Sequence, residues 1–405
     1  MLGHAQRVLL QQGAHAMRRA TTSINKAHLE ESIMSMVAMD GSASGGLVRR
    51  PIQRVLESLH RAEAFAATDA PASYTASYKL AGGRGTGKSV GLDMVKAWAS
   101  ERGWRVLALP SAATLATKAI HLQQAKAWTT AEGEPAEMYD SSDMAGLILG
   151  MVENAAWLRD LPLVAPLDAT HLGEDTVLPA GDADLGKAFD LAHKYEAMAP
   201  SAVVMLRAAL AADAHSAPSD APPILVAIDD YNAFFDKSNF DDGGKSYVHA
   251  QQLSHCALFT HWGQNPEVIR PRHTIDFANA PLTRGAVVVA DSGSVVPSKA
   301  HFDSAAYTAA HMRNKVNFAP YSTAELRAVL SAAAAAGAID PSIMAQFDDV
   351  YDSIDLEDRG LVAADGSAKP PASDADLPDA YVEYVAAVTG GNAEKVNKAA
   401  VDFLG

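Results

Sequence analysis

Short runs of consecutive apolar residues alternate along the chain with longer segments in which apolar residues recur every three or four positions. Three of these runs, at 105–109, 224–228 and 284–290, are typical of buried parallel strands. A shorter run at 78–81 comes before a glycine-rich segment, and residues 88–99 then have helical spacing. Strands that alternate with helices predict an α/β fold, with a parallel sheet flanked by helices. The first two strands and the helix between them predict a parallel crossover unit.

Helical spacing also predicts the segments around these strands. Pro51 is placed to open a helix, and residues 111–222 read as a mostly helical insertion. Within the insertion we expect helices over 142–158 and 184–212, the second one broken near Pro200, and a surface excursion over 162–181.

The segment Gly82–Ser89 reads Gly-Gly-Arg-Gly-Thr-Gly-Lys-Ser and matches the phosphate-binding loop G-x-x-x-x-G-K-[S/T]. Glycines let successive backbone N–H groups converge on phosphate oxygens, and the helix that follows adds the positive end of its dipole. A strand is predicted before the motif and a helix after it, with Val90, Met94, Val95 and Trp98 on its apolar face. We therefore expect a nucleotide to bind here, on Gly82, Gly83, Arg84, Gly85, Thr86, Gly87, Lys88 and Ser89. Lys88 would contact the β- and γ-phosphates, and the Ser89 hydroxyl would ligate Mg²⁺.

Polar residues follow two of the apolar runs. Ligands of open α/β sheets bind at the carboxyl ends of the strands, so Asp229 is expected to hold Mg²⁺ through water. Asp230 stands where related ATPases place a catalytic, water-polarising acid, although Asp is one methylene shorter than the usual Glu. After 284–290, Ser292 is a candidate to sense the γ-phosphate, together with Asp291 and Ser294. A strand followed by an ordinary Ser/Gly turn is the alternative.

Composition narrows the class of protein. The chain has 405 residues, 48% of them hydrophobic, which is enough for two or three domains with a substantial core. Its single cysteine, Cys256, excludes a disulfide framework, and no apolar run approaches the length of a membrane span. The formal charge of −15 argues against broad wrapping of nucleic acid, so any RNA contact is expected to be local.

The N-terminus differs from the rest of the chain in charge. Residues 1–29 contain Arg7, Arg18, Arg19 and Lys26, and no acidic residue comes before Glu30. This pattern is typical of a mitochondrial presequence, with Arg18-Arg19-Ala20 as a processing point. An ordinary basic tail, or an arm that becomes ordered on a partner, is the alternative.

The C-terminal part predicts a small helical lid. A helix is expected from a cap at Ser322 or Thr323 to Gly337, and two more over 381–388 and 393–404, separated by a turn at 389–392. The chain then divides into an N-terminal arm (1–50), a P-loop nucleotide-binding domain (51–320) and the lid (321–405).

Several motifs together resemble the death-associated protein 3 family, over roughly residues 50–405. They are the phosphate loop, Ile-Asp-Asp-Tyr-Asn-Ala-Phe-Phe (228–235), Arg-Gly-Ala-Val-Val-Val-Ala (284–290), Pro-Tyr-Ser-x-x-Glu (320–325) and Thr-Gly-Gly-Asn (389–392). The last two look like the lid signature shared with AAA-type and signal-transduction ATPases, so the resemblance implies a P-loop NTPase of AAA/STAND-like type. The family often has Gly where this chain has Asp230.

The resemblance implies a structural GTP-binding protein in the head of the mitochondrial small ribosomal subunit, in the mitochondrial matrix. It implies bound GTP or GDP with Mg²⁺, and contacts with small-subunit proteins, local rRNA and the large subunit across the intersubunit face, with no membrane. A guanine-reading Asn-Lys-x-Asp motif is absent, so the sequence leaves ATP as an alternative.

A second hypothesis is a free AAA/STAND-like ATPase that acts as a cycling switch. Such an enzyme usually needs an arginine finger, for which Arg270, Arg272, Arg284 and Arg313 are candidates that no spacing rule separates. With no identified finger and an Asp in place of Glu, we expect slow hydrolysis at most.

Overall fold

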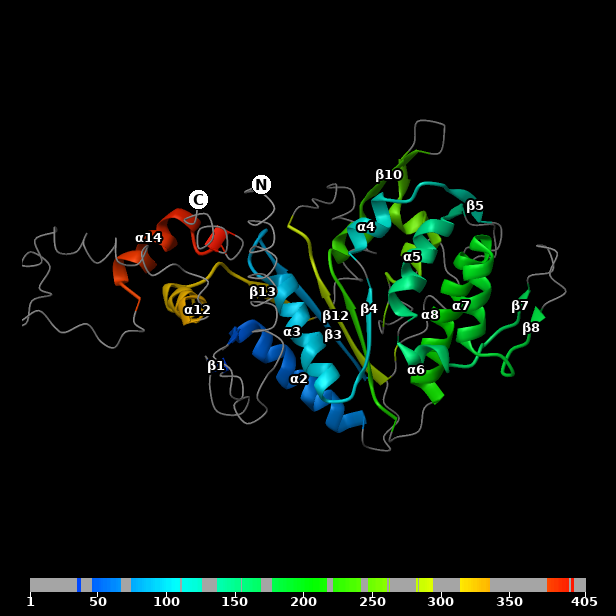
Figure 1. The fold of residues 1–405 in the computed structure, drawn as a ribbon, viewed down its shortest axis with the longest axis horizontal. Coiled ribbons are helices and arrows are strands. Elements are labelled where there is room, and N and C mark those ends of the chain that lie inside the picture. Colours follow the sequence, from blue (N-terminus) through cyan, green and yellow to red (C-terminus); the bar gives the residue numbers. More distant parts are fainter. Residues whose placement is uncertain are drawn as a thin grey trace, which may run out of the picture. The chain divides into compact units, whose positions relative to one another are not determined.

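The computed structural model describes much of the chain between residues 35 and 396 (Figure 1). The described residues are 35–37, 46–66, 74–109, 111–125, 137–153, 155–168, 177–216, 221–241, 247–260, 262, 282, 284–293, 314–335, 377–392 and 395–396. The predicted presequence and most of the predicted helix 393–404 lie outside them, as does Ser294.

The chain folds into two compact units. The first, here called the loop unit, comprises Met1–Arg54, Gly82–Trp98 and Phe318–Gly405. The second, the sheet unit, comprises Val55–Ala81 and Ala99–Asn317. The phosphate-loop motif and the C-terminal helices therefore belong to one unit, and the strands and the helical insertion belong to the other.

Five strands form the main sheet, in the order β13-β3-β12-β9-β4. Their bounds are Tyr74–Gly82 (β3), Arg105–Leu109 (β4), Ile224–Ile228 (β9), Arg284–Ala290 (β12) and Asn314–Phe318 (β13). The β3–β12, β12–β9 and β9–β4 pairs are all parallel. The predicted strands 105–109, 224–228 and 284–290 are confirmed with the same bounds, and β3 is longer than the predicted run. The α/β class and the strand–loop–helix order of a P-loop NTPase are confirmed.

β3 and β4 run parallel in one sheet, as the predicted crossover unit requires. The two strands are consecutive in the main sheet's chain order but are not neighbours in space, because β12 and β9 lie between them. Local sequence specifies a parallel connection, whereas the pairing partners of β3 come from residues more than 200 positions later. This order places the strand that leads into the phosphate loop inside the sheet.

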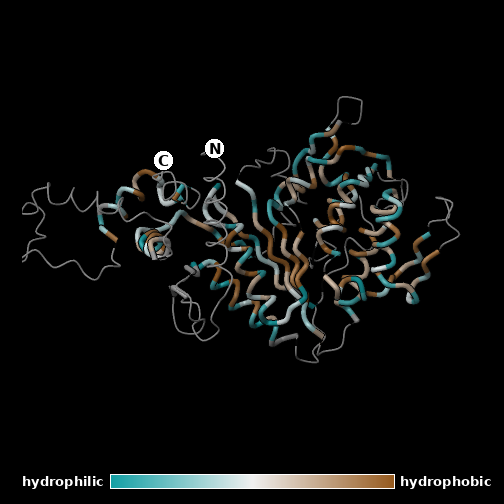
Figure 2. The backbone as a smooth tube through the Cα atoms, in the orientation of Figure 1, coloured by the Kyte–Doolittle hydropathy of each residue, from teal (hydrophilic) through white to brown (hydrophobic). Residues whose placement is uncertain are grey.

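The two faces of the sheet pack against different sets of residues. Ile224, Val226 and Ile228 of β9 are buried in one large apolar cluster together with residues of the insertion, whereas the alternate residues Leu225 and Ala227 are buried outside that cluster. This alternation is the period of two expected of a strand. Both sets are apolar because parallel strands in such a sheet are covered on both faces, and the strands in the middle of the sheet are largely brown in Figure 2.

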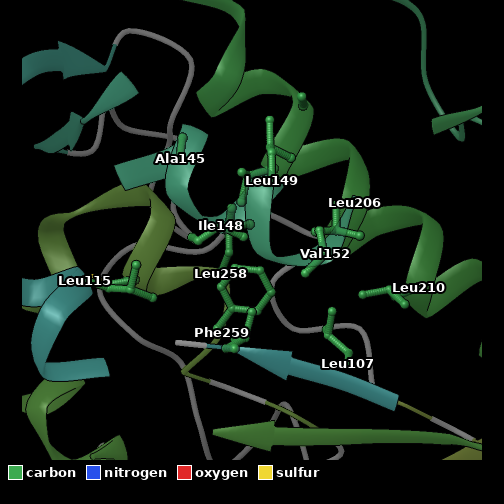
Figure 3. Close-up of a cluster of buried hydrophobic side chains, with 14 of the residues drawn as sticks. Leu107, Leu115, Ala145, Ile148, Leu149, Val152, Leu206, Leu210, Leu258 and Phe259 are labelled. Atoms are coloured by element: carbon green, nitrogen blue, oxygen red, sulfur yellow. The ribbon is translucent and has the colours of Figure 1, made fainter. Parts of the chain in front are cut away.

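The helical insertion and the segments after β9 supply the helices packed on one face. The insertion contains α4 (Ala112–Thr117), β5 (Gln123–Ala125), β6 (Met138–Asp140), α5 (Ser142–Val152), α6 (Ala156–Arg159), β7 (Leu167–Asp168), β8 (Val177–Leu178), α7 (Leu185–Lys194), η3 (Glu196–Met198) and α8 (Ala199–Ser216). After β9 come η4 (Tyr231–Phe235), β10 (Lys237–Asp241), β11 (Tyr247–His249), η5 (Ala250–Gln252) and α9 (Ser254–Ala257). Figure 3 shows Ile148, Val152 and Leu206 meeting Phe259 and Leu107 in this core.

Two predicted helices of the insertion are divided differently from the prediction. The helix predicted over 142–158 is two helices, α5 and α6, because Ala155 has an extended backbone at φ −83° and ψ 91°. The predicted break near Pro200 lies earlier, at Tyr195, which is also extended. Pro200 is the second residue of α8, where a missing N–H removes no helical hydrogen bond. The strands β5 and β6 were not predicted, because runs such as Gln-Gln-Ala carry no apolar signal.

One helical stretch is long and apolar enough to cross a membrane by length and composition alone. It runs from Glu196 to His215, and most of it is buried inside the protein. Ala202, Val203 and Leu206 on this stretch are fully buried in the sheet-unit core. This stretch, which comprises η3 and most of α8, therefore belongs to the core of the sheet unit.

In the loop unit, the C-terminal helices form a small core of their own. The unit contains β1 (Ser35–Val37) paired with β2 (Gly46–Val48), α12 (Thr323–Ala335) and α14 (Asp379–Thr389). Leu326 and Leu330 of α12 pack against Tyr381, Val382 and Val385 of α14. Both helices were predicted, and the cap is confirmed.

Two helices have residues in both units. α2 (Arg50–Ala66) begins in the loop unit, and α3 (Lys88–Glu101) begins at the motif lysine. Met94, Val95 and Trp98 of α3 are buried as predicted, but Val90 is 46% exposed. Val90 lies in the first turn, next to the exposed Ser89, so the apolar face begins one turn later than the spacing suggests.

Candidate functional site

The phosphate-loop motif has backbone angles that glycine alone adopts readily. Gly85 and Gly87 have φ values of 72° and 88°, in the left-handed region. A Cβ on Gly82 would lie 2.3 Å from the backbone oxygen of Phe318 and 2.9 Å from Oγ1 of Thr86. Gly85 and Gly87 are therefore required for the turns of the motif, and Gly82 for the close approach of Phe318, whereas a Cβ on Gly83 would make only an ordinary contact with Thr86 at 3.7 Å.

Lys88 folds back over the loop. Its Nζ donates hydrogen bonds to the backbone oxygens of Gly82 at 3.0 Å and Gly83 at 2.6 Å, and the residue is only 7% exposed. Thr86 Oγ1 also donates to the Gly83 oxygen, at 2.9 Å. The ammonium group of Lys88 thus lies against the backbone of the loop that is expected to bind phosphate. The next residue, Ser89, is exposed.

Arg49 connects three segments of the loop unit. Its Nη1 donates to the backbone oxygen of Thr86 in the motif, and its Nη2 donates to the backbone oxygen of Ala319, each at 2.9 Å. Its Nε donates to Oε1 of Glu325 in α12, also at 2.9 Å. The guanidinium lies over the ring of Tyr321 at 4.7 Å, and the residue is 8% exposed. Sequence analysis assigned Arg49 to the N-terminal arm and gave it no role.

Glu325 is fixed by two sets of hydrogen bonds. Besides Arg49, it accepts from the backbone N–H of Ser322 at 2.9 Å, while its own N–H donates to Ser322 Oγ at 3.3 Å. This reciprocal pair is a capping box at the start of α12. Burial alone would raise the pKa of Glu325, but the hydrogen bonds and the charge of Arg49 outweigh it and hold the pKa below its ordinary value.

The turn after α14 contacts both the segment between β13 and α12 and the phosphate loop. Gly391 has a φ of 70°, and its backbone oxygen accepts from the N–H of Tyr321 at 2.7 Å. Asn392 Nδ2 donates to the backbone oxygen of Arg84 at 2.6 Å, while its Oδ1 accepts from the N–H of Lys395 at 3.2 Å. The Gly-Gly-Asn signature therefore places a lid side chain on the motif.

In the sheet unit, the two predicted acids follow β9. Asp229 Oδ1 accepts from the N–H of Asp230 at 2.9 Å, and the Asp229 backbone oxygen accepts from the N–H of Ala112. Asp230 has a left-handed φ of 54°, and its carboxylate accepts a hydrogen bond from the hydroxyl of Ser111, the N-cap of α4. Asp230 thus helps to fix the start of α4.

Asn232 holds the segment after β12. Its Nδ2 donates to the backbone oxygen of Ser292 at 2.9 Å, and its Oδ1 accepts from the Ser292 N–H at 2.7 Å. Asn232 is 4% exposed. Ser292 is thereby fixed to the η4 turn that follows Asp229 and Asp230, so the structure brings these three predicted residues to one edge of the sheet unit. Neither Asn232 nor Ser111 was assigned a role from sequence, although Asn232 lies in the motif quoted above.

Two further predicted residues have defined places in the sheet unit. Asp291 pairs with Lys79 of β3, at 3.2 Å between Nζ and Oδ2, beside a backbone bond from the Asp291 N–H to Leu80. Among the four arginine candidates only Arg284 lies in the described residues, and it begins β12. A seven-residue strand spans roughly 20 Å, so Arg284 stands far from the Asp291 end. It is not placed to act on a nucleotide at that edge in its own molecule.

The loop-unit residues fit the phosphates of a nucleotide. Left-handed glycines at positions 85 and 87 form the kind of backbone concavity that binds anions, and Lys88 supplies a cation beside it. Gly82 and Gly83 leave no side chain in the way. Ser89, at the second position of α3, carries the hydroxyl that this motif uses for Mg²⁺.

The chain was compared with known proteins. The sequence model of the family "Mitochondrial ribosomal death-associated protein 3" matches residues 47–349. A search of curated proteins gave no match. Among solved structures, Cdc6p from Pyrobaculum aerophilum matches with 14% identity and a TM-score of 0.34, covering 90% of this chain and 68% of the other. This structural likeness is too weak to assign a fold or function. The family match spans most of the chain and includes the phosphate loop, β9 with Asp229 and Asp230, and the segment between β13 and α12. The chain belongs to the mitochondrial ribosomal death-associated protein 3 family.

Proposed function

We propose that this protein is a structural, nucleotide-binding component of the small subunit of the mitochondrial ribosome. The observation that carries the proposal is a complete phosphate-binding loop, folded with left-handed glycines and a buried lysine, in a member of this ribosomal family. Its place of action is the mitochondrial matrix, in the head of the small subunit. Other small-subunit proteins, local rRNA and the large subunit across the intersubunit face are the proposed partners, and the charge of −15 favours protein neighbours.

The nucleotide is GTP or GDP, with ATP as the alternative. The N–H groups of residues 82–89 and the Lys88 ammonium would hold the phosphates, and Ser89 would ligate Mg²⁺. Asp229 would hold the same ion through water, and Ser292 would sense the γ-phosphate. Asp229 follows β9 and Ser292 follows β12, at the carboxyl ends of neighbouring parallel strands, where ligands of open α/β sheets bind. When bound, Mg²⁺ neutralises charge on the phosphate oxygens.

Hydrolysis is expected to be slow. The Asp230 carboxylate accepts a hydrogen bond from Ser111, so its role as a catalytic acid would require that contact to be exchanged for water. The proposal expects single-turnover hydrolysis on purified small subunits well below 1 s⁻¹, the lower end of rates typical of kinases. A rate on the order of 1 s⁻¹ that collapses in Asp230→Asn would instead favour the cycling ATPase.

Sedimentation separates the two functions. Co-migration of the native protein with small ribosomal subunits at moderate salt supports the ribosomal role, while a free pool or a closed ring supports the ATPase switch.

Lys88→Ala tests the nucleotide site itself. The substitution removes the cation beside the phosphates, so we expect loss of bound nucleotide from the purified protein and a lower Tm in the presence of Mg²⁺·GDP. Because Lys88→Ala also removes the hydrogen bonds to the Gly82 and Gly83 oxygens, the effect of the ligand is measured as the rise in Tm that Mg²⁺·GDP produces in each protein. Full nucleotide occupancy in Lys88→Ala would show that the site is wrongly assigned.

A further inference from the structure

Two side chains from outside the phosphate loop hold its backbone carbonyl groups. Asn392, in the turn after α14, donates to the oxygen of Arg84, and Arg49, before α2, donates to the oxygen of Thr86. The two acceptors alternate with the two left-handed glycines, Gly85 and Gly87. All of these residues lie within the loop unit.

The planarity of the peptide bond gives these contacts a consequence for anion binding. In a trans peptide the carbonyl of one residue and the N–H of the next point in opposite directions. Holding the Arg84 oxygen therefore orients the N–H of Gly85, and holding the Thr86 oxygen orients the N–H of Gly87. A phosphate-binding loop needs its N–H groups turned inward and its carbonyl groups turned outward.

We propose that Asn392 and Arg49 are positioning residues that preset the peptide planes of the phosphate loop, so that docking of the C-terminal lid controls phosphate affinity. The inference rests on the proposed nucleotide site and adds its regulation. Neither side chain needs to touch the nucleotide. Their effect is pre-organisation, because a loop already fixed in its binding conformation loses less entropy when the ligand arrives.

The lid is built to make these contacts together. Glu325, in the first turn of α12, accepts from Arg49, and Gly391 packs on Tyr321, over which the Arg49 guanidinium lies. Asn392 is itself fixed, since its Oδ1 accepts from Lys395 and thereby orients the Nδ2 toward the motif. A displaced lid would release both carbonyl groups at once. By reciprocity, phosphate binding would stabilise the docked lid by the same factor.

Asn392→Asp is the sharpest variant. It keeps Oδ1, and so the cap to Lys395, but it loses the donor to Arg84 and places an oxygen against an oxygen. Arg327→Gln is the matched control, because it also changes the charge by −1 on the lid, while the Arg327 partners are Leu377 and Asp379. Asn392→Ala removes the donor with no change of charge, and Arg49→Lys keeps the charge but not the fork of three donors.

The experiment is calorimetric titration of the full chain with Mg²⁺–tripolyphosphate, which has phosphates and no base. We expect Asn392→Asp, Asn392→Ala and Arg49→Lys each to weaken binding about fivefold or more, since one net hydrogen bond corresponds to about that factor. Arg327→Gln should stay within about twofold. Far-UV circular dichroism of Asn392→Asp without ligand should match the wild type, because Asp caps a helix as well as Asn does, and this separates positioning of the loop from loss of the lid helices.

The lid supplies the second readout. Tripolyphosphate should protect residues 377–392 from limited proteolysis in the wild type, and this protection should be lost in Asn392→Asp. Wild-type affinity and protection in Asn392→Asp, alongside loss of binding in Lys88→Ala, would overturn the inference and leave the nucleotide site standing. Absence of tripolyphosphate binding in the wild type, or undiminished binding in Lys88→Ala, would overturn both.

Discussion

The paired hydrogen bonds between Asn232 and Ser292 make a quantitative prediction about the sheet unit. Asn232→Ala removes both the 2.9 Å and the 2.7 Å bond, and the residue is too buried for water to replace them readily. Each net hydrogen bond contributes about 1 kcal/mol, so the free energy of unfolding should fall by about 2 kcal/mol. For a unit of roughly this size, that corresponds to a Tm lower by about 4–8 °C.

The assay is urea unfolding of the full chain at 25 °C, followed by far-UV circular dichroism and by tryptophan fluorescence. Asn314→Ala is the matched control, because Asn314 makes one bond, to the Ser77 oxygen at 3.1 Å, from an exposed position at the start of β13. We expect the control to lose less than about 0.5 kcal/mol. Asn232→Asp keeps the acceptor but buries a carboxylate against the Ser292 carbonyl, so it should be at least as destabilising as Asn232→Ala at pH 7.

The outcome can refute the reasoning in two ways. An Asn232→Ala protein that unfolds at the same urea concentration as Asn314→Ala would mean that the bonds to Ser292 add nothing beyond a surface contact. A large loss in Asn232→Ala with none in Asn232→Asp would mean that packing of the side chain, and not its donor, holds the segment after β12.

Three further predictions concern the core of the sheet unit and the lid. Gly391→Ala should destabilise the lid by more than Gly390→Ala, as judged by proteolysis of α14, because a Cβ at 391 would lie 2.4 Å from the Tyr321 oxygen while a Cβ at 390 meets nothing; equal effects would contradict this. Leu206→Ala should lower the free energy of unfolding by about 2–5 kcal/mol in urea, since the side chain is fully buried in the core of Figure 3. The lowered pKa of Glu325 implies stability that is present above its ordinary pKa of 4.5 and is lost as the pH falls through the lower folded value. The Tm of the wild type should therefore exceed that of Glu325→Gln near neutral pH, and this difference should disappear at acid pH. A difference that stays constant down to pH 3 would contradict the lowered pKa.

Local sequence determined the elements whose cause is local. The strands 105–109, 224–228 and 284–290 have the predicted bounds because a continuous apolar run between polar residues leaves little choice of register or length. The phosphate loop was evident because its function requires specific residue types at consecutive positions, and the cap of α12 because Ser322 and Glu325 are three residues apart. Boundaries that depend on packing, such as the break at Tyr195, were placed less well.

Tertiary structure alone decided which side chains surround the loop. Arg49 reaches Thr86 across 37 positions and Glu325 across 276, and Asn392 reaches Arg84 across 308. No periodicity or spacing rule links residues so far apart. The order of the sheet is of the same kind, since β3 pairs with β12 although the whole insertion lies between them in the chain. A sequence specifies the chemistry of a phosphate loop through neighbouring residues, but the hydrogen bonds that hold its carbonyl groups come from wherever the fold brings a donor.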